Sequence, residues 1–126
     1  MCFNALVSNT DDHPRNHALI AHDRDWRLSP AYDLTPYPHV SMERRDLAMI
    51  CGDAGRYANA DNLLSQHARF LLDEPDARSI LGTMAERVSA NWYGFMRAAG
   101  VSEADCARIS GAFLYPGFGH AVATGH

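Results

Sequence analysis

Apolar residues recur at helical spacing along much of the chain. Near the start, Phe3, Leu6 and Val7 follow the i, i+3, i+4 spacing of one helical face and predict the last turns of a helix. The clearest pattern covers about residues 75–98 and predicts the principal helix, with Gly100 just beyond its end. Its apolar stripe consists of Ala77, Ile80, Leu81, Met84, Val88, Trp92, Phe95 and Met96. We therefore expect a mainly helical domain.

Two shorter helices are predicted on either side of the principal one. Residues 60–72 carry apolar side chains at mixed three- and four-residue steps, with Asn59 or Asp61 as the N-cap. Another helix is expected to begin at Ser102, because Ser-Glu-Ala-Asp is a variant of the capping box. This last helix is expected to bury Cys106, Ile109 and Phe113.

Between the first helix and residue 60 the pattern is not helical. Residues 17–21 and 26–28 read as two short strands around a turn at 23–25, which predicts a β-hairpin. Residues 35–58 contain prolines and glycines and are expected to form an irregular, flexible connection. The tail, residues 115–126, is rich in glycine and histidine and is expected to be ordered only if another part of the chain pins it.

Composition narrows the class of protein. A chain of 126 residues, 47% of them hydrophobic, fits a single compact domain. Its formal charge of −4 gives no general basic field, so a nucleotide is a better ligand prediction than duplex nucleic acid. Three cysteines without metal-ligand spacing predict reduced thiols. The first residues lack a signal or transmembrane pattern, and we expect a cytoplasmic protein with no membrane association.

Candidate chemistry is concentrated between residues 9 and 33. Asp11 is followed five residues later by Asn16, and Asp33 comes after the predicted hairpin. In a protein-kinase-like site the first aspartate accepts the proton of the attacking hydroxyl, while the asparagine and the second aspartate hold magnesium. Pro14 disfavours helical geometry at His13, so these residues should lie on a loop. Since a hairpin returns the chain to where it left, Asn16 and Asp33 should meet at one metal ion.

Plainer interpretations exist for the same residues. Asp and Asn often cap turns, which alone would explain this loop, and Asp12 fits neither spacing and is interpreted as a solvated or capping residue. His13 and His17 lie four apart, as a zinc pair on a helix would, but Pro14 interrupts that helix and argues against zinc. Trp92 and the methionines near it are interpreted as core.

The combined motifs resemble a known family. Val-Ser-Asn-Thr-Asp-Asp-His-Pro-Arg-Asn-His-Ala-Leu at 7–19, followed by Trp-Arg-Leu-Ser-Pro-Ala-Tyr-Asp-Leu at 26–34, is similar to the catalytic half of the HipA-like serine/threonine kinases, toxins of bacterial toxin–antitoxin modules. The resemblance implies a mainly α fold with a small β-hairpin: the C-terminal lobe of a protein-kinase-like fold, without the N-terminal ATP-binding lobe. That lobe would span 1–126, divided into 1–34 with the catalytic loop, hairpin and metal-binding aspartate, the connection 35–58, the helical part 59–114 and the tail 115–126.

The resemblance also implies roles for individual residues. Asp11 would be the catalytic base or hydroxyl-orienting group, and Asn16 and Asp33 would be magnesium ligands. His13 would contact the transferred phosphate, with a contribution that depends on pH. Leu34 follows Asp33, so the phenylalanine of the Asp-Phe-Gly switch has no counterpart. The implied cofactors are ATP and Mg²⁺, and the implied partners are a helix-turn-helix antitoxin, a protein substrate such as an aminoacyl-tRNA synthetase, and DNA only through the antitoxin.

The parts of a kinase that hold ATP have no counterpart here. No lysine-bearing strand or phosphate-covering loop precedes Asp11, so we expect half an active site, inactive alone, with Met1 as an internal start. The helices should still fold, leaving the face around residues 1–8 and the hairpin exposed and prone to self-association into a homo-oligomer. Two other functions remain open: a non-catalytic module that binds an antitoxin or itself, and a metal-dependent hydrolase that uses Asp11, His13 and Asp33.

Overall fold

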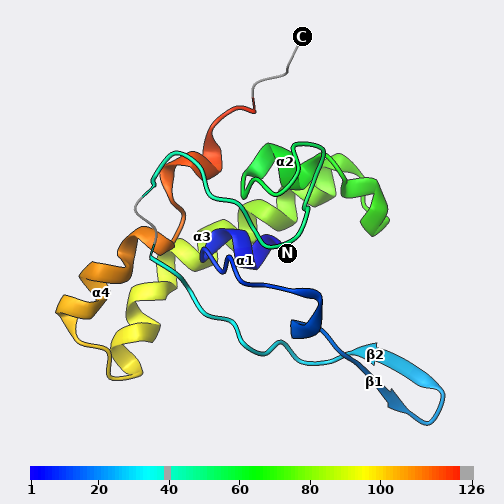
Figure 1. The fold of residues 1–126 in the computed structure, drawn as a ribbon, viewed down its shortest axis with the longest axis horizontal. Coiled ribbons are helices and arrows are strands. Elements are labelled where there is room, and N and C mark those ends of the chain that lie inside the picture. Colours follow the sequence, from blue (N-terminus) through cyan, green and yellow to red (C-terminus); the bar gives the residue numbers. More distant parts are fainter. Residues whose placement is uncertain (39–40, 123–126) are drawn as a thin grey trace.

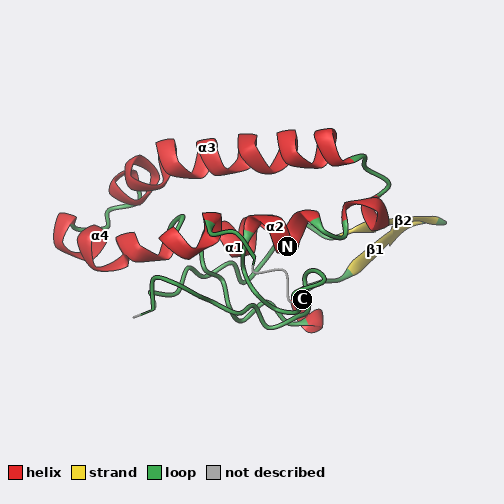
Figure 2. Cartoon of the chain, turned by 90° about the horizontal axis from the view of Figure 1, so that it is seen from above, coloured by secondary structure: helices red, strands yellow, loops and turns green. Residues whose placement is uncertain are grey.

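The computed structural model describes residues 1–38 and 41–122, and within them the chain is helix-rich with one antiparallel hairpin. The α-helices and strands are α1 (Cys2–Leu6), β1 (Leu19–His22), β2 (Asp25–Leu28), α2 (Ala60–Leu64), α3 (Glu74–Ala98) and α4 (Glu103–Ile109). Short 3₁₀ turns occur at Pro14–Asn16, His67–Phe70, Ser110–Ala112 and Pro116–Gly119. In Figure 2, α3 runs along one side of the molecule, with the shorter helices beside it and the long loops beyond them. The expectation of a mainly α fold with a small hairpin is therefore confirmed.

Helix α3 begins where the sequence predicts. The side chain of Asp73 accepts a hydrogen bond from the backbone N–H of Asp76 at 2.8 Å, Pro75 occupies the first turn, and Gly100 takes a positive φ of 87° after the helix ends. The predicted stripe is too wide, however. Ile80 is 47% and Phe95 is 73% exposed, because the core lies along the line from Ala77 through Leu81 to Met84 and Val88.

The core is shared between helices and loops. From the α-helices it contains Ala5 and Leu6 of α1, Leu63 and Leu64 of α2 and Leu81 of α3. The residues outside the α-helices are Leu47, Cys51, Ala58, Tyr115 and Phe118. The expectation of a flexible, purely connecting segment at 35–58 was wrong in this respect: the segment supplies three of these core residues and forms isolated β-bridges between Asp46 and Tyr57 and between Gly52 and Gly55. Residues 39–40 lie outside the described part.

The helix predicted over 60–72 ends early. Helix α2 stops at Leu64, because the hydroxyl of Ser65 donates to the carbonyl of Asn62 at 2.6 Å and competes for an acceptor that would continue the helix. The chain then makes the 3₁₀ turn His67–Phe70 and leaves Leu71 exposed in the left-handed region at φ 57°.

The tail is pinned as far as Val122, since Asn59 Nδ2 donates to His120 O at 2.7 Å and the N–H of Val122 donates to Oδ2 of Asp61 at 3.4 Å. The backbone N–H of Leu114 donates to Leu6 O at 2.9 Å, the hydroxyl of Tyr115 donates to Ala58 O at 2.5 Å, and the N–H of Gly117 donates to Met42 O at 2.9 Å. Cys106 is buried as predicted, whereas Ile109 and Phe113 are only half-buried. Residues 123–126 lie outside the described part.

The hairpin projects from the body (Figure 1). Its strands pair Leu19 with Leu28 and Ala21 with Trp26 around a turn at 23–24. The turn begins where predicted and ends one residue earlier, because β2 already begins at Asp25. All eight strand residues are exposed, as we expected for the hairpin. Around residues 1–8, Met1 and Phe3 are exposed, but Asn4 to Ser8 are buried, so the expectation of an exposed face was wrong for residues 4–8. No helix in the described ranges is both long and apolar enough to cross a bilayer.

Candidate functional site

The candidate residues lie on a loop, as Pro14 predicts. This loop, residues 9–17, is named the catalytic loop after its predicted role. It leaves α1 through Ser8, which is buried with a positive φ of 55°. Pro14 opens the 3₁₀ turn Pro14–Asn16, in which the N–H of Asn16 donates to His13 O at 2.9 Å. In return, the N–H of His13 donates to the side-chain Oδ1 of Asn16 at 3.1 Å. The turn thus holds both the backbone and the amide of Asn16 in place.

Asn16 and Asp33 meet across the hairpin, as predicted. The Nδ2 of Asn16 donates to Oδ2 of Asp33 at 2.8 Å, although 17 residues separate them. A second bond, from the hydroxyl of Tyr32 to Arg15 O at 2.8 Å, joins the same two segments. Asp33 itself has a positive φ of 57°, a strained conformation for a residue other than glycine. The two residues proposed as magnesium ligands therefore lie within hydrogen-bonding distance of each other.

Asp11 and His13 face solvent beside this site. The side chain of Asp11 is 84% exposed, and its Oδ1 lies 2.6 Å from Nε2 of His13. This contact engages only one of the two side-chain oxygens of Asp11. His13 is half-buried against the loop, and its contact with a phosphate stays a prediction.

Asp12 has a different environment, and its interpretation as a solvated or capping residue was wrong. Its side chain is 8% exposed and accepts two hydrogen bonds, from Nδ2 of Asn4 at 2.6 Å and from Nε2 of His17 at 2.8 Å. Asn9 extends the network by donating to Oδ1 of Asn4 at 3.1 Å. A polar Asn4 within an otherwise apolar helix was the available signal, because a buried amide requires a partner.

A second network, not foreseen from the sequence, supports the loop from behind. Arg45 donates through Nη1 to Ser8 Oγ at 2.6 Å and to Gly111 O at 2.7 Å, and its guanidinium lies over the ring of Tyr115, 4.5 Å from the centroid. Ser8 Oγ in turn donates to Ala112 O at 2.6 Å. Burial lowers the pKa of Arg45 and raises the pKa of Tyr115 to about 12. These buried groups fix the start of the catalytic loop.

The donor atoms fit magnesium in kind. Carboxylate and amide oxygens are hard ligands, and Mg²⁺ is commonly held by one or two carboxylates together with substrate phosphates. In the present arrangement Oδ1 of Asn16 accepts from His13 and Nδ2 points to Asp33, so the amide must turn to present its oxygen beside the carboxylate. Within residues 1–38 and 41–122, no group of three His, Cys, Asp or Glu side chains converges on a metal-sized site. His13 and His17 bind different aspartates and do not form a pair.

One comparison with known proteins identifies the family of this chain. Searches of curated proteins and of solved structures returned no match. A family model described as the HipA-like C-terminal domain matches residues 1–92. The matched range takes in the catalytic loop, the hairpin, Asp33 and most of α3. On this evidence the chain belongs to the family of HipA-like C-terminal domains.

Proposed function

We propose that this chain provides the catalytic loop and the metal-binding residues of a HipA-like serine/threonine protein kinase. The observation that carries the proposal is the 2.8 Å hydrogen bond between Asn16 and Asp33, formed beside an exposed Asp11 on the same loop. A protein-kinase phosphoryl-transfer site requires two side chains with oxygen ligands and one exposed carboxylate from its C-terminal lobe. Asn16, after its amide turns, and Asp33 would be the ligands, and Asp11 would be the carboxylate.

Each residue has a distinct task in the proposed reaction. The free carboxylate oxygen of Asp11 accepts and orients the proton of the serine or threonine hydroxyl as it attacks. His13, whose Nε2 lies 2.6 Å from the other oxygen, holds that carboxylate in place, and we propose that it also contacts the transferred phosphate. Asn16, once its amide has turned, and Asp33 would hold a magnesium ion, which would supply the charge that neutralises the ATP phosphates.

Nucleotide binding requires groups that this chain does not contain. All 11 of its basic residues are arginine, so the lysine with which kinases bind the α- and β-phosphates must come from an ATP-binding half. We therefore propose that the chain by itself binds Mg-ATP weakly and transfers no phosphate. The helix-turn-helix antitoxin and a protein substrate are proposed as partners on the strength of the family, with DNA reached only through the antitoxin.

The test joins this chain to the ATP-binding half of a HipA-like kinase and measures autophosphorylation and Mg-ATP binding. Asp33→Ala should abolish phosphoryl transfer and weaken Mg-ATP binding together, because it removes the metal carboxylate. Asp11→Ala should leave nucleotide binding nearly intact while the rate falls about 10²-fold or more, since proton acceptance matters chiefly in the transition state.

Glu86→Ala is the matched control, because it removes an exposed carboxylate from the solvent side of α3. Glu86→Ala should change neither the rate of phosphoryl transfer nor the affinity for Mg-ATP. Full activity in Asp11→Ala, or unchanged Mg-ATP binding in Asp33→Ala, would refute the assignment.

A second candidate is a non-catalytic interaction module. The hairpin favours it, because Leu19, Trp26 and Leu28 lie on one face of the strand pair and all three are exposed. The same joined protein separates the two functions: a module would bind its antitoxin and show no phosphoryl transfer. A metal-dependent hydrolase has weaker support, because it would need more preformed ligands than Asn16 and Asp33 provide.

A further inference from the structure

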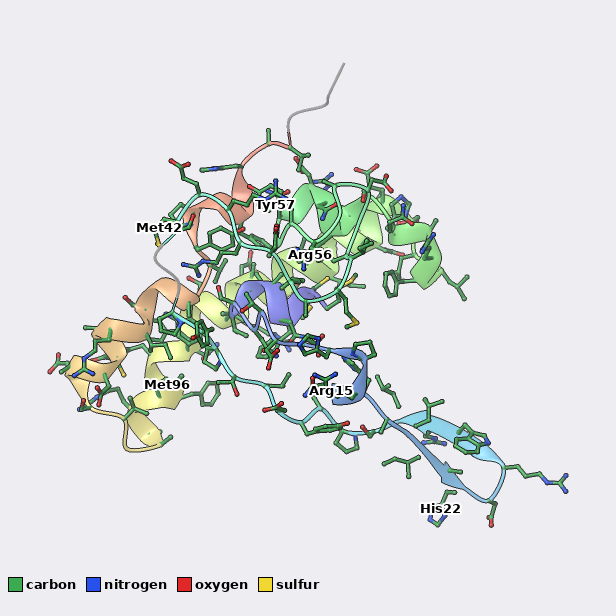
Figure 3. The ribbon with its side chains drawn as sticks, viewed as in Figure 1. Arg15, His22, Met42, Arg56, Tyr57 and Met96 are labelled. Carbon is green, nitrogen blue, oxygen red and sulfur yellow. The ribbon has the colours of Figure 1, made fainter. Side chains whose placement is uncertain are left out.

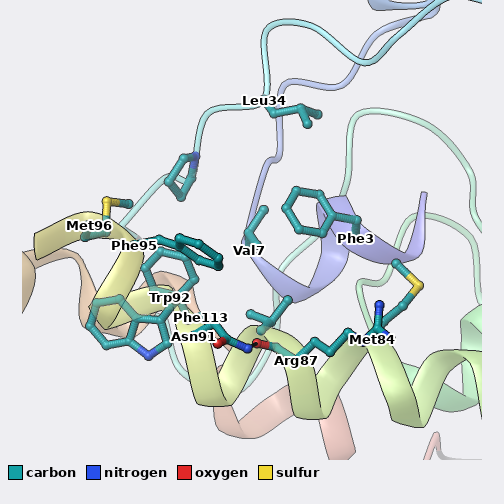
Figure 4. Close-up of a pocket in the computed structure, with 12 residues that line it drawn as sticks. Phe3, Val7, Leu34, Met84, Arg87, Asn91, Trp92, Phe95, Met96 and Phe113 are labelled. Carbon is teal, nitrogen blue, oxygen red and sulfur yellow. Dashed lines mark hydrogen bonds between the residues drawn. The ribbon is translucent and has the colours of Figure 1, made fainter. Parts of the chain in front are cut away.

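An apolar groove of about 670 Å³ runs along α3 and is separate from the catalytic loop. One wall is α3, and the facing wall consists of α1 and the segment that follows Asp33 (Figure 4). The lining residues outside α3 are Phe3, Val7, Leu34, Pro36 and Phe113. The ring of Phe113 stacks on Trp92 at 4.5 Å between centroids and 15° between planes. The groove is therefore formed by packed apolar side chains, with the stacked rings of Trp92 and Phe113 in its lining.

The α3 wall has the geometry of a helix-packing seam. Its lining residues are Met84, Arg87, Val88, Asn91, Trp92, Phe95 and Met96, which follow one another at steps of three and one. This is the spacing into which the side chains of a second helix interdigitate. From Met84 to Met96 the seam extends about 18 Å, the length of a helix of about three turns. An amphipathic helix fits this groove better than a compact ligand does.

Charge restricts which helix fits. Arg87 is the one charged residue in the lining of the groove, and no carboxylate of the described residues forms an ion pair with it. The neighbouring Asn91 donates to Arg87 O at 2.8 Å, which uses the backbone and leaves the guanidinium available. A second copy of this α3 face would bring another Arg87 and no carboxylate, so the charge disfavours self-pairing.

We propose that the groove binds an amphipathic α-helix of a partner protein, with its apolar side chains against Trp92 and Met96 and an aspartate or glutamate opposite Arg87. The proposal does not depend on phosphoryl transfer, because none of the groove residues belongs to the proposed chemistry. The helix would also cover Leu34, the residue that follows Asp33.

The experiment uses designed helical peptides of about four turns with leucines along one face and a single glutamate placed in turn at each position of that face. Binding is read from the fluorescence of Trp92 in a Trp26→Phe background, since these are the two tryptophans of the chain. One glutamate position should bind best, about tenfold more tightly than the same peptide with glutamine there.

Charge reversal provides the decisive comparison. Arg87→Glu should lose this preference and bind the corresponding lysine peptide instead, while Arg69→Glu, which changes a charge outside the groove, should behave like the parent chain. Circular dichroism confirms that each variant is folded. Equal binding of the glutamate and glutamine peptides, no binding at all, or a dimer of the chain that occupies the groove and excludes the peptides would each overturn the proposal.

Discussion

Asp11 and Asp12 are adjacent and chemically identical, yet the fold assigns them opposite environments. Asp11 points to solvent, whereas the carboxylate of Asp12 is enclosed by Asn4 and His17 and joins α1 to the far end of the catalytic loop. A buried carboxylate keeps its charge only with such partners. Asp12 therefore fixes the loop on which Asp11 presents its oxygen.

We predict that Asp12→Ala lowers the free energy of unfolding by about 1–3 kcal/mol, because the buried amide of Asn4 and the partly exposed ring of His17 lose their acceptor. Asp11→Ala, at an exposed site, should stay within about 0.5 kcal/mol of the parent chain. Urea denaturation measures both. Equal losses for the two variants would contradict the assigned burial.

The sequence predicted some of the site and missed the rest for identifiable reasons. The meeting of Asn16 and Asp33 follows from a spacing and a hairpin, which are local features. The burial of Asp12 depends on which side of the loop packs on α1, and no spacing within the loop encodes that. Arg45 was missed because its partners, Ser8 and Tyr115, lie far away in the sequence.

At the scale of elements, the 3₁₀ turn Pro116–Gly119 closes one end of the core. Its Gly117 packs so tightly on the segment before Arg45 that an added Cβ would lie 1.8 Å from the backbone oxygen of Glu43. The side chain of Asn59, which caps α2, also donates to Gly117 O at 3.1 Å. The turn and the cap therefore stabilise one another.

Gly117→Ala should destabilise the protein by about 1–3 kcal/mol or more, because the backbone of Glu43 has to move. Gly119→Ala is the paired control, since no atom lies within 4 Å of a Cβ at that position, and it should change stability by less than about 0.5 kcal/mol. Thermal unfolding of both variants checks this. If the Gly117→Ala protein had the same melting temperature as the parent chain, the tight packing of Gly117 on Glu43 would be refuted.

Elements with strong local signals were predictable, and those held by tertiary contacts were not. For helix α3, the apolar periodicity, the N-cap and the glycine after its end all indicate the same bounds, so the observed ends match the predicted ones. The segment 35–58 has no period, because Leu47, Cys51 and Ala58 reach the core from irregular backbone. The exposure of Phe95 shows what the apolar periodicity of a helix does not predict. Periodicity identifies the apolar face of the helix, but not how much of that face is covered by other elements.

At the scale of the whole molecule, the free energy of unfolding at alkaline pH depends on the ionisation of Tyr115. The chain has no lysine, so tyrosines and cysteines are the side chains that ordinarily titrate between about pH 8 and 11. Burial raises the pKa of Tyr115 to about 12, above its value of about 10 in an unfolded chain. The unfolded state therefore loses this proton first, and stability falls as pH rises from about 10 toward 12.

We predict that this fall in unfolding free energy is shallower in Tyr115→Phe, which has no hydroxyl to ionise. The variant should also be less stable at pH 8, because Ala58 O loses its donor. Burial raises the pKa of the Cys2 and Cys51 thiols as well, and their effect has the same sign, so the difference between the two chains is the quantity to measure. Parallel curves from pH 8 to 11.5 would count against the burial of Tyr115.

The Tyr115 contacts also bear on where the domain ends. The family match stops at residue 92, within α3, yet Leu114, Tyr115 and Gly117 bind back to Leu6, Ala58 and Met42. The matched range is thus shorter than the stretch that packs into one core. Cutting the chain after residue 92 would remove Tyr115 and Phe118 from that core, although the matched range would stay whole.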